Sequence, residues 1–190
     1  MNQITQQTNY EACSIEELKQ FEADMIGLFN YRKATKPNDY FFSDEENLVL
    51  DTVRFFITKK ENQNDSVKIG DMFYTNWGYE QTNTEHFKIV KISPTGKTCQ
   101  VVQIGSKTVP GSEYSHGMAD MVEPDSENEL DYGTCQVKIE RSSAFNPITQ
   151  HHEKVKEFYL RGSVWYARGN GKHLQSLYRC KGANYRSWYA

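Results

Sequence analysis

The chain has 190 residues, of which 37% are hydrophobic and 25% are charged, and its formal net charge is −3. This composition is typical of a folded globular protein and excludes a disordered chain. Its apolar runs are much shorter than the ~18 residues that a membrane-spanning helix requires, and the polar first residues lack the apolar stretch of a secretory signal. We therefore expect a protein of the cytoplasm.

Four cysteines are spread along the chain: Cys13, Cys99, Cys135 and Cys180. No two of them form a Cys-x-x-Cys pair, and none lies at zinc-finger spacing from a histidine. Because thiols stay reduced in the cytoplasm, we expect four ordinary, mostly buried thiols and no metal site. Two disulfides are the alternative that the even number leaves open.

The first predicted element is a helix that begins after Ser14 and ends near Arg32. Ser14 is a good N-cap, and Glu17 three residues later completes a capping box. Apolar residues recur at helical spacing and predict one buried stripe, which consists of Ile15, Leu18, Phe21, Met25, Leu28 and Phe29.

A second helix is predicted from Ser43 to about Lys60, with a capping box formed by Ser43 and Glu46. Its expected buried face consists of Leu48, Val49, Thr52, Val53, Phe56 and Ile57. Residues 61–66 are polar and are interpreted as a linker. We therefore divide the chain into a helical region, residues 1–66, and a β domain, residues 67–190.

Strand-like segments begin after residue 67. Residues 72–77, 86–92 and 98–104 predict three consecutive antiparallel strands. Residues 105–131 are predicted to be mostly loop. Further strands are expected at 133–141, 156–167, 174–180 and 185–189. The fold class that follows is α+β, with an N-terminal helical pair and a small antiparallel SH3-like β-barrel.

Charge is distributed unevenly along the sequence. Residues 1–66 have a net charge of −5 (7 basic, 12 acidic), and residues 67–190 have a net charge of +2 (15 basic, 13 acidic). Residues 120–131 contain six acidic side chains and no basic one, whereas residues 154–190 contain eight basic side chains and one acidic one. The acidic run is interpreted as a solvated loop, or alternatively as a mimic of a nucleic-acid backbone. The two segments can also pair with each other.

The segment at residues 77–83 reads Trp-Gly-Tyr-Glu-Gln-Thr-Asn and is the most distinctive motif of the chain. Together with residues 118–124, the pair Gly171-Lys172 and the closing Ser-Trp-Tyr-Ala, it resembles small proteins of bacteriophages and other mobile elements that carry Trp-Gly-Tyr-Asp-Gln-Thr-Asn. The resemblance covers about residues 67–190, and this chain departs from it at Glu80, where Asp is usual. It implies an origin in a phage or mobile element of a bacterial host, and it implies no particular activity.

The same segment provides the first candidate site. Trp77 and Tyr79 have rings that can stack on a base or on a partner's side chain. Glu80, Gln81 and Asn83 supply hydrogen-bonding groups beside them, so the segment is predicted to bind a partner. The alternative is structural: the tryptophan fills the barrel, the glycine makes a bulge, and the polar side chains bond the local backbone.

Basic and aromatic residues alternate between residues 159 and 189 and form the second candidate site. Cations and exposed rings on a sheet are what single-stranded nucleic acid requires. The residues assigned to this alternative are Arg168, Lys172, Arg179, Lys181, Arg186 and Trp188. The structural explanation is an ordinary half-buried sheet, whose cations lie on the wet face or pair with the acids of residues 120–131.

Common catalytic motifs are absent from the sequence. The five histidines are scattered, and neither a Gly-x-Ser-x-Gly nor a His-Glu-x-x-His motif occurs. A hairpin would bring Glu80 and His86 together as an acid–base pair, as in a small hydrolase or transferase. We predict no catalytic residue, no metal and no cofactor, and we keep the Glu80–His86 enzyme as an alternative.

We therefore expect a non-enzymatic accessory binding protein of a phage or mobile element, which acts in the cytoplasm of its bacterial host. Its expected partner is a host protein or ribonucleoprotein, such as a defence nuclease that it inhibits, and not a membrane. The alternative partner is single-stranded nucleic acid.

Overall fold

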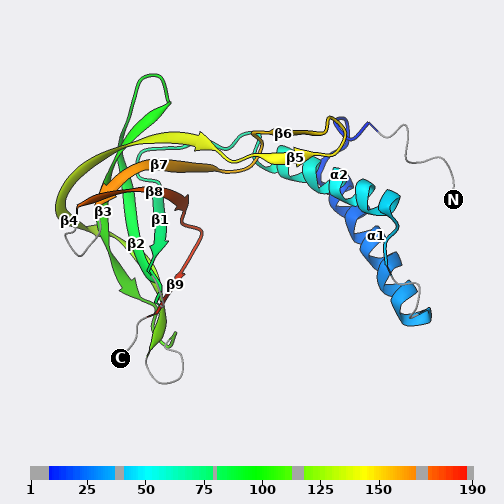
Figure 1. Ribbon diagram of the computed structural model, residues 1–190, viewed down its shortest axis with the longest axis horizontal. Coiled ribbons are helices and arrows are strands. Elements are labelled where there is room, and N and C mark those ends of the chain that lie inside the picture. Colours follow the sequence, from blue (N-terminus) through cyan, green and yellow to red (C-terminus); the bar gives the residue numbers. More distant parts are fainter. Residues whose placement is uncertain (1–8, 37–40, 79–80, 113–117, 166–170, 188–190) are drawn as a thin grey trace. The chain divides into compact units, whose positions relative to one another are not determined.

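The computed structural model describes residues 9–36, 41–78, 81–112, 118–165 and 171–187. The protein is α+β: the described residues form two helices, one large antiparallel sheet and one small two-stranded sheet (Figure 1). The chain divides into two compact units. The helical unit comprises Met1–Asp65 and Arg141–Glu157, and the sheet unit comprises Ser66–Glu140 and Phe158–Ala190.

Both helices begin where the sequence predicts: α1 spans Ile15–Thr35 and α2 spans Asp44–Glu61. The Glu17 amide donates to the Ser14 hydroxyl at 3.1 Å, and the Ser14 amide donates to the Glu17 carboxylate at 2.7 Å. An equivalent capping box precedes α2, with distances of 3.2 and 3.0 Å. Each box satisfies amides that a helix N-terminus otherwise leaves unbonded, which explains why both starts can be read from the sequence.

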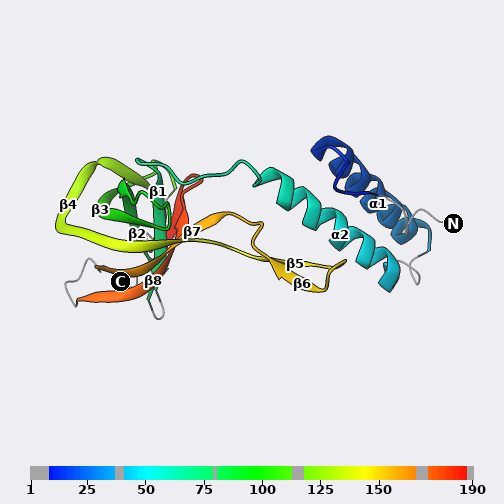
Figure 2. The same ribbon diagram turned by 90° about the horizontal axis from the view of Figure 1, so that it is seen from above.

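A β-hairpin that the sequence did not predict completes the helical unit. β5 (Ala144–Asn146) pairs antiparallel with β6 (His151–Glu153), and β5 contacts α2 (Figure 2). Val155, just after the hairpin, is buried in one cluster with Leu18 of α1 and Phe56 of α2. The helical unit therefore includes this segment, which the division at residue 66 assigns to the β domain.

The apolar stripes of the two helices are only partly buried. On α1, Leu18 is buried, whereas Leu28 is 44% exposed. On α2, Leu48 is 52% exposed, and Leu50 and Phe55 are buried instead. The predicted buried faces are therefore wrong at Leu28 and Leu48, because periodicity identifies an apolar side of a helix but its packing partner decides how much is covered. Neither helix of the described residues is long and apolar enough to cross a membrane.

Within the described residues, the large sheet has seven strands, in the order β3-β2-β1-β8-β7-β4-β9, and β4 also pairs with β3. The strands are β1 (Met72–Trp77), β2 (Asn83–Ile92), β3 (Thr98–Thr108), β4 (Ala119–Arg141), β7 (Phe158–Trp165), β8 (Lys172–Arg179) and β9 (Asn184–Ser187). β1, β2 and β3 form the predicted antiparallel meander, in which Phe73 lies opposite Phe87.

Strand β4 occupies much of the segment that the sequence predicts as loop, residues 105–131. It is 23 residues long and pairs with β3, although most of its middle part is exposed. Two ion pairs support this middle part, Lys107–Asp125 at 2.9 Å and Lys88–Glu129 at 2.5 Å. The loop prediction is therefore wrong here, because a strand that buries neither face carries no apolar alternation. The acidic run lies on this strand and is not a solvated loop.

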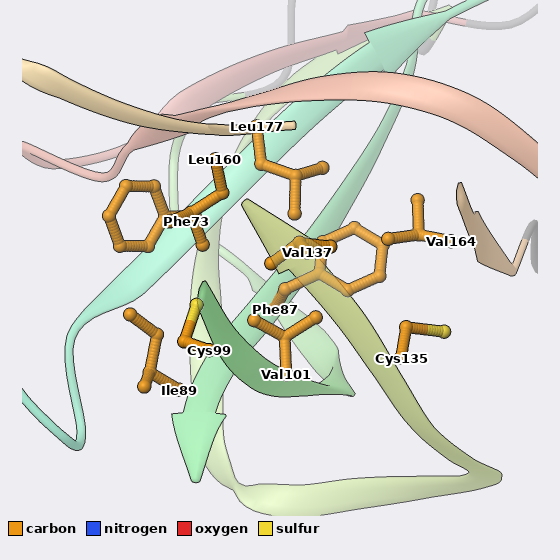
Figure 3. Packing of buried hydrophobic residues seen from close by; sticks show 10 residues of the cluster. All are labelled: Phe73, Phe87, Ile89, Cys99, Val101, Cys135, Val137, Leu160, Val164 and Leu177. Carbon is orange, nitrogen blue, oxygen red and sulfur yellow. The ribbon is translucent and has the colours of Figure 1, made fainter. Parts of the chain in front are cut away.

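The core of the sheet unit is formed by side chains from β1, β2, β3, β4, β7 and β8 (Figure 3). Phe73 and Phe87 come from the paired strands β1 and β2, and Leu160 and Leu177 come from the paired strands β7 and β8. These four side chains are at most 1% exposed. Because side chains alternate along a strand, Tyr74, Tyr159 and Tyr178, which follow Phe73 or flank Leu160 and Leu177, point to the outer face of the sheet.

All four cysteines are free thiols, as predicted, and Cys99 and Cys135 are buried. Burial raises the pKa of the Cys99 thiol to about 11. It also raises the pKa of the half-buried Cys180 thiol, to about 12. Both groups are therefore protonated near neutral pH, which makes them poor nucleophiles.

Candidate binding face

Three tyrosines from three adjacent strands form a row on the outer face of the sheet. Tyr74 of β1 lies opposite Tyr178 of β8, and Tyr178 lies opposite Tyr159 of β7. The ring centroids are 6.3 Å apart in the first pair and 6.4 Å apart in the second. Their chain neighbours Phe73 and Leu177 are fully buried, so alternation along the strands directs the three rings outward.

Basic and apolar side chains continue this face along β7 and β8. Arg161 is exposed and lies opposite Ser176 in the sheet, and Leu174 is 62% exposed. At the far end of the two strands, Lys172 lies opposite Trp165, with its Nζ 4.9 Å from the ring centroid. We call this surface the aromatic–basic face, which consists of Tyr74, Tyr159, Arg161, Lys172, Leu174 and Tyr178. Trp165 is partly buried and packs against the core of the sheet unit.

A pocket of about 470 Å³ opens on the aromatic–basic face. Its lining combines tyrosine rings, one guanidinium and neutral hydrogen-bonding groups, and includes Tyr74, Asn76, Arg161, Leu174, Ser176 and Tyr178. The volume falls within the range of known ligand sites. The lining is suited to a ligand that has both planar and anionic groups, because rings stack on planar groups and guanidinium pairs with anions.

The Tyr159 ring is held in place at one edge of the row. Its hydroxyl donates a hydrogen bond to the Glu140 carboxylate. This bond, assisted by partial desolvation, raises the pKa of the Tyr159 phenol, so the group stays neutral. A ring that is fixed before binding loses less conformational entropy when a ligand stacks on it.

The 77–83 motif lies where β1 ends and β2 begins. Trp77, Gln81 and Asn83 are half-buried, whereas Tyr79 and Glu80 lie outside the described residues. Trp77 pairs with Asn83 across the strands, and Nδ2 of Asn83 donates to the Trp77 carbonyl at 3.4 Å. At this position, the polar side chain bonds the local backbone.

Gly78 has a conformational reason to be glycine. Its φ is +128°, and a Cβ atom there would lie 2.3 Å from the carbonyl oxygen of Gln81. The motif is also bonded to β9, because the Thr82 amide donates to the Ser187 hydroxyl and the Ser187 amide donates to the Thr82 carbonyl, both at 2.9 Å. Several positions of the motif therefore have structural roles.

Two of the cations that were assigned to nucleic-acid binding form ion pairs with acids of the sheet unit. Nη2 of Arg179 lies 3.3 Å from the Asp71 carboxylate. Arg186 forms two bonds with Asp120, from Nη2 at 2.7 Å and from Nε at 3.0 Å. Asp120 is only 2% exposed. The pairing of a C-terminal cation with the 120–131 acids, which the structural explanation expects, is therefore present for Arg186.

Of the other residues that were assigned to nucleic-acid binding, two are described by the structure and two are not. Lys172 lies on the aromatic–basic face, and Lys181 is exposed after β8. Arg168 and Trp188 lie outside the described residues. The sequence did not predict Tyr74 as a site residue, because Tyr178, which lies beside it in the sheet, is about a hundred residues away in the chain.

His86 is a buried histidine with hydrogen bonds at both ring nitrogens. Its side chain is fully buried, Nδ1 lies 2.7 Å from the Ser106 hydroxyl, and Nε2 lies 3.2 Å from Nδ2 of Asn184. Nδ2 of Asn184 also donates to the Gly182 carbonyl, so we assign the amide as donor to Nε2 and the imidazole proton to Nδ1. Burial, together with the charge of Arg186, lowers the pKa of His86 to about 4.

The Glu80–His86 pair falls partly outside the described residues, because Glu80 is not among them. His86 itself is neutral at physiological pH and engaged in structural bonds at both nitrogens. In the part of the chain that the structure describes, no group of three or more His, Cys, Asp or Glu side chains could hold a metal ion.

Comparison with known proteins adds no relative: no family model, curated protein or solved structure matches the chain. The described residues define a class of protein by structure alone: an α+β fold with an antiparallel sheet that carries a row of outward-facing tyrosines flanked by cations.

Proposed function

We propose that this chain is a non-enzymatic binding protein whose aromatic–basic face binds single-stranded nucleic acid. The observation that supports this proposal is the row of Tyr74, Tyr178 and Tyr159 beside the exposed Arg161. Rings accept unpaired bases by stacking, and cations beside them neutralise the backbone phosphates. The net charge of −3 argues for a local contact at this face and against non-specific coating of nucleic acid.

We also infer that the sheet unit is a small SH3-like barrel. The strand pairings support this, because β4, the sixth strand in order, pairs back with β3, the first. The resemblance of the 77–83 motif supports an origin in a phage or mobile element, and hence action in the cytoplasm of a bacterial host.

A second candidate function is binding and inhibition of a host protein or ribonucleoprotein, such as a defence nuclease. The observation that favours it is a series of exposed carboxylates along β4, from Glu123, Glu127 and Asp131, beside Glu129, which pairs with Lys88. Negative charges placed at intervals along a strand can occupy a basic groove that otherwise holds a nucleic-acid backbone. This function uses a different strand from the aromatic–basic face, so the two candidates can be tested separately.

Replacing Tyr178 by alanine tests the nucleic-acid proposal. Affinity for a fluorescent oligothymidine, measured by anisotropy, is expected to fall about tenfold or more, because one base–ring stack contributes roughly 1–3 kcal/mol. Tyr132→Ala, which removes an exposed tyrosine of β4 outside the face, serves as the matched control and should leave the affinity unchanged. In the unmodified protein, two phosphate contacts, at Arg161 and Lys172, predict a slope of about −1.4 for log affinity against log salt.

Equal affinities of the Tyr178→Ala and Tyr132→Ala variants would contradict the assignment of the site to this face. Absence of salt-dependent binding by the unmodified protein would contradict nucleic-acid binding itself. If the protein instead retained a host nuclease, and neutralisation of Glu123 and Glu127 abolished the retention, the second candidate function would replace the first.

A further inference from the structure

The pocket on the aromatic–basic face lies where two strands of the sheet unit separate. Among the described residues, β1 and β8 pair at two positions, Phe73 with Arg179 and Tyr74 with Tyr178. Beyond Tyr74, β1 continues beside β2, and the facing part of β8 continues beside β7. The lining of the pocket comes from both sides of this opening and from β7, and consists of Tyr74, Thr75, Asn76, Arg161, Leu174, Gln175, Ser176 and Tyr178.

A side-chain hydrogen bond crosses the opening on its inner side. The Thr75 hydroxyl donates to the carboxamide oxygen of Gln175 at 3.2 Å, and Thr75 is 2% exposed. Both residues alternate with the outward-facing tyrosines of their strands, so their side chains point to the inner side of the sheet. Their neighbours Asn76 and Ser176 point outward by the same alternation. The pocket therefore has a closed floor and opens towards the tyrosine row.

The carboxamide of Asn76 is oriented by Thr84, which lies opposite it in β2. Oγ1 of Thr84 lies 2.8 Å from the Asn76 side-chain oxygen position and 2.7 Å from the backbone carbonyl oxygen of Tyr185. A hydroxyl has one proton, and a backbone carbonyl can only accept, so the Thr84 hydroxyl donates to Tyr185. It can then only accept from Asn76, which places the NH₂ group beside Thr84. The two orientations of a carboxamide have nearly the same shape, and the hydrogen-bond network decides between them.

With its NH₂ group directed at Thr84, Asn76 offers its carboxamide oxygen to a ligand as a hydrogen-bond acceptor. Asn76 is exposed and lines the pocket. Ser176 adds a hydroxyl, and Arg161, which lies opposite Ser176 in the sheet, adds a cation. Tyr178 is 52% exposed and presents its ring beside these groups. The pocket thus combines a ring for stacking, a fixed acceptor and a cation for a phosphate.

We propose that this pocket takes one unpaired base of the bound strand and selects bases that carry an exocyclic amino group, which the Asn76 oxygen recognises. The inference rests on the proposed function and adds base selectivity to it. The volume of about 470 Å³ is sufficient for a single base with its sugar. In single-stranded nucleic acid the hydrogen-bonding edges of the bases are open to such a contact.

Cytosine and uracil provide the sharpest contrast, because they have nearly the same size and differ at this edge. Cytosine carries an amino group that donates to a side-chain oxygen. Uracil carries a carbonyl oxygen in its place, and its ring N–H lies between two carbonyl groups, whose negative charge repels an approaching acceptor. A fixed acceptor at Asn76 therefore favours cytosine.

Fluorescence anisotropy with oligodeoxycytidine and oligodeoxyuridine of equal length, at a pH where cytosine is neutral, tests this inference. The unmodified protein is expected to bind oligodeoxycytidine about fivefold more tightly, the effect of one neutral hydrogen bond. Asn76→Ala should reduce this affinity to about that for oligodeoxyuridine. Asn128→Ala removes an exposed carboxamide from β4, outside the pocket, and should keep the preference.

Thr84→Val tests the orientation of the carboxamide separately. Valine has nearly the shape of threonine but cannot accept the hydrogen bond, so the oxygen of Asn76 is no longer held towards the pocket. The ratio of the two affinities is expected to fall towards one. Circular dichroism of each variant verifies that it is folded.

The possible failures can be told apart. Equal affinities for the two oligonucleotides, or a preference that Asn76→Ala retains, would overturn the inference and leave the proposed function standing. A preference for oligodeoxyuridine would show that the NH₂ group faces the pocket, which also overturns it. Absence of binding to either oligonucleotide would overturn the proposed function and this inference together.

Discussion

Replacing Arg186 by methionine is expected to lower the free energy of unfolding by about 3–5 kcal/mol, the usual effect of leaving a buried charge without its partner. The Asp120 carboxylate is 2% exposed and receives two bonds from Arg186, at 2.7 and 3.0 Å. Thr108 donates a further bond to it at 3.0 Å, which cannot replace the lost positive charge. Urea unfolding, followed by tryptophan fluorescence, measures the change.

An exposed ion pair provides the control for this prediction. Nζ of Lys107 lies 2.9 Å from the Asp125 carboxylate, but its side chain is 65% exposed. Lys107→Met should therefore change the unfolding free energy by no more than about 1 kcal/mol. A double variant that replaces Arg186 by methionine and Asp120 by leucine should regain part of the loss, because no buried charge remains. Equal effects of the two single variants would show that the Asp120 site is hydrated.

The unfolding free energy is also expected to fall by about 3 kcal/mol as the pH is lowered from about 7 to 4, through His86 alone. The pKa of His86 is lowered from 6.5 to about 4 in the folded protein, chiefly by burial and then by the charge of Arg186. Below pH 6.5 the unfolded chain binds a proton that the folded protein does not, so acid favours unfolding. The bond donated by Asn184 opposes protonation further, because Nε2 would then have to donate towards another donor.

Urea unfolding of the unmodified protein and of His86→Gln, at several pH values, isolates this effect. The carboxylates titrate in both proteins and cancel in the difference between the two curves. The variant is expected to be less stable near neutral pH and to lose less stability as the pH falls. Two parallel curves would mean that His86 accepts a proton in the folded state without penalty.

The two helix starts could be predicted because their signals are local. Ser14 with Glu17, and Ser43 with Glu46, form complete capping boxes within four residues of sequence. The meander of β1, β2 and β3 could be predicted for a similar reason, since each strand pairs with the next one along the chain. Neighbouring elements joined by short connections leave few other pairings open.

The first part of strand β4, residues 119–131, and the β5–β6 hairpin could not be predicted, because what holds them is distant in sequence. This part of β4 depends on its backbone bonds to β3 and on ion pairs such as Lys88–Glu129, and its residues carry no apolar alternation. The hairpin is held through Val155, whose partners are on helices about a hundred residues earlier. The structure of these segments therefore depends on other segments of the chain, and it follows from the sequence only when those contacts are known.

The sequence predicted which types of residue form the candidate face, but not which individual residues belong to it. The sequence shows that basic and aromatic residues alternate after residue 159, but it cannot separate Arg161, which is exposed, from Arg186, which pairs with Asp120. Nor does it indicate that Tyr74 of β1 joins the row, since that contact follows from the pairing of β1 with β8. The strand pairings therefore decide which rings and cations share one surface.

A ¹H–¹⁵N correlation spectrum of the full chain, titrated with oligothymidine, tests directly whether the aromatic–basic face binds nucleic acid. We predict that the shifts concentrate on outward-facing residues of β1, β7 and β8, above all Tyr74, Tyr159, Arg161 and Tyr178. Amides of the 77–83 motif and of β4 should move little. Shifts that concentrate instead on the acidic strand β4, or no shifts at all, would contradict binding at the aromatic–basic face.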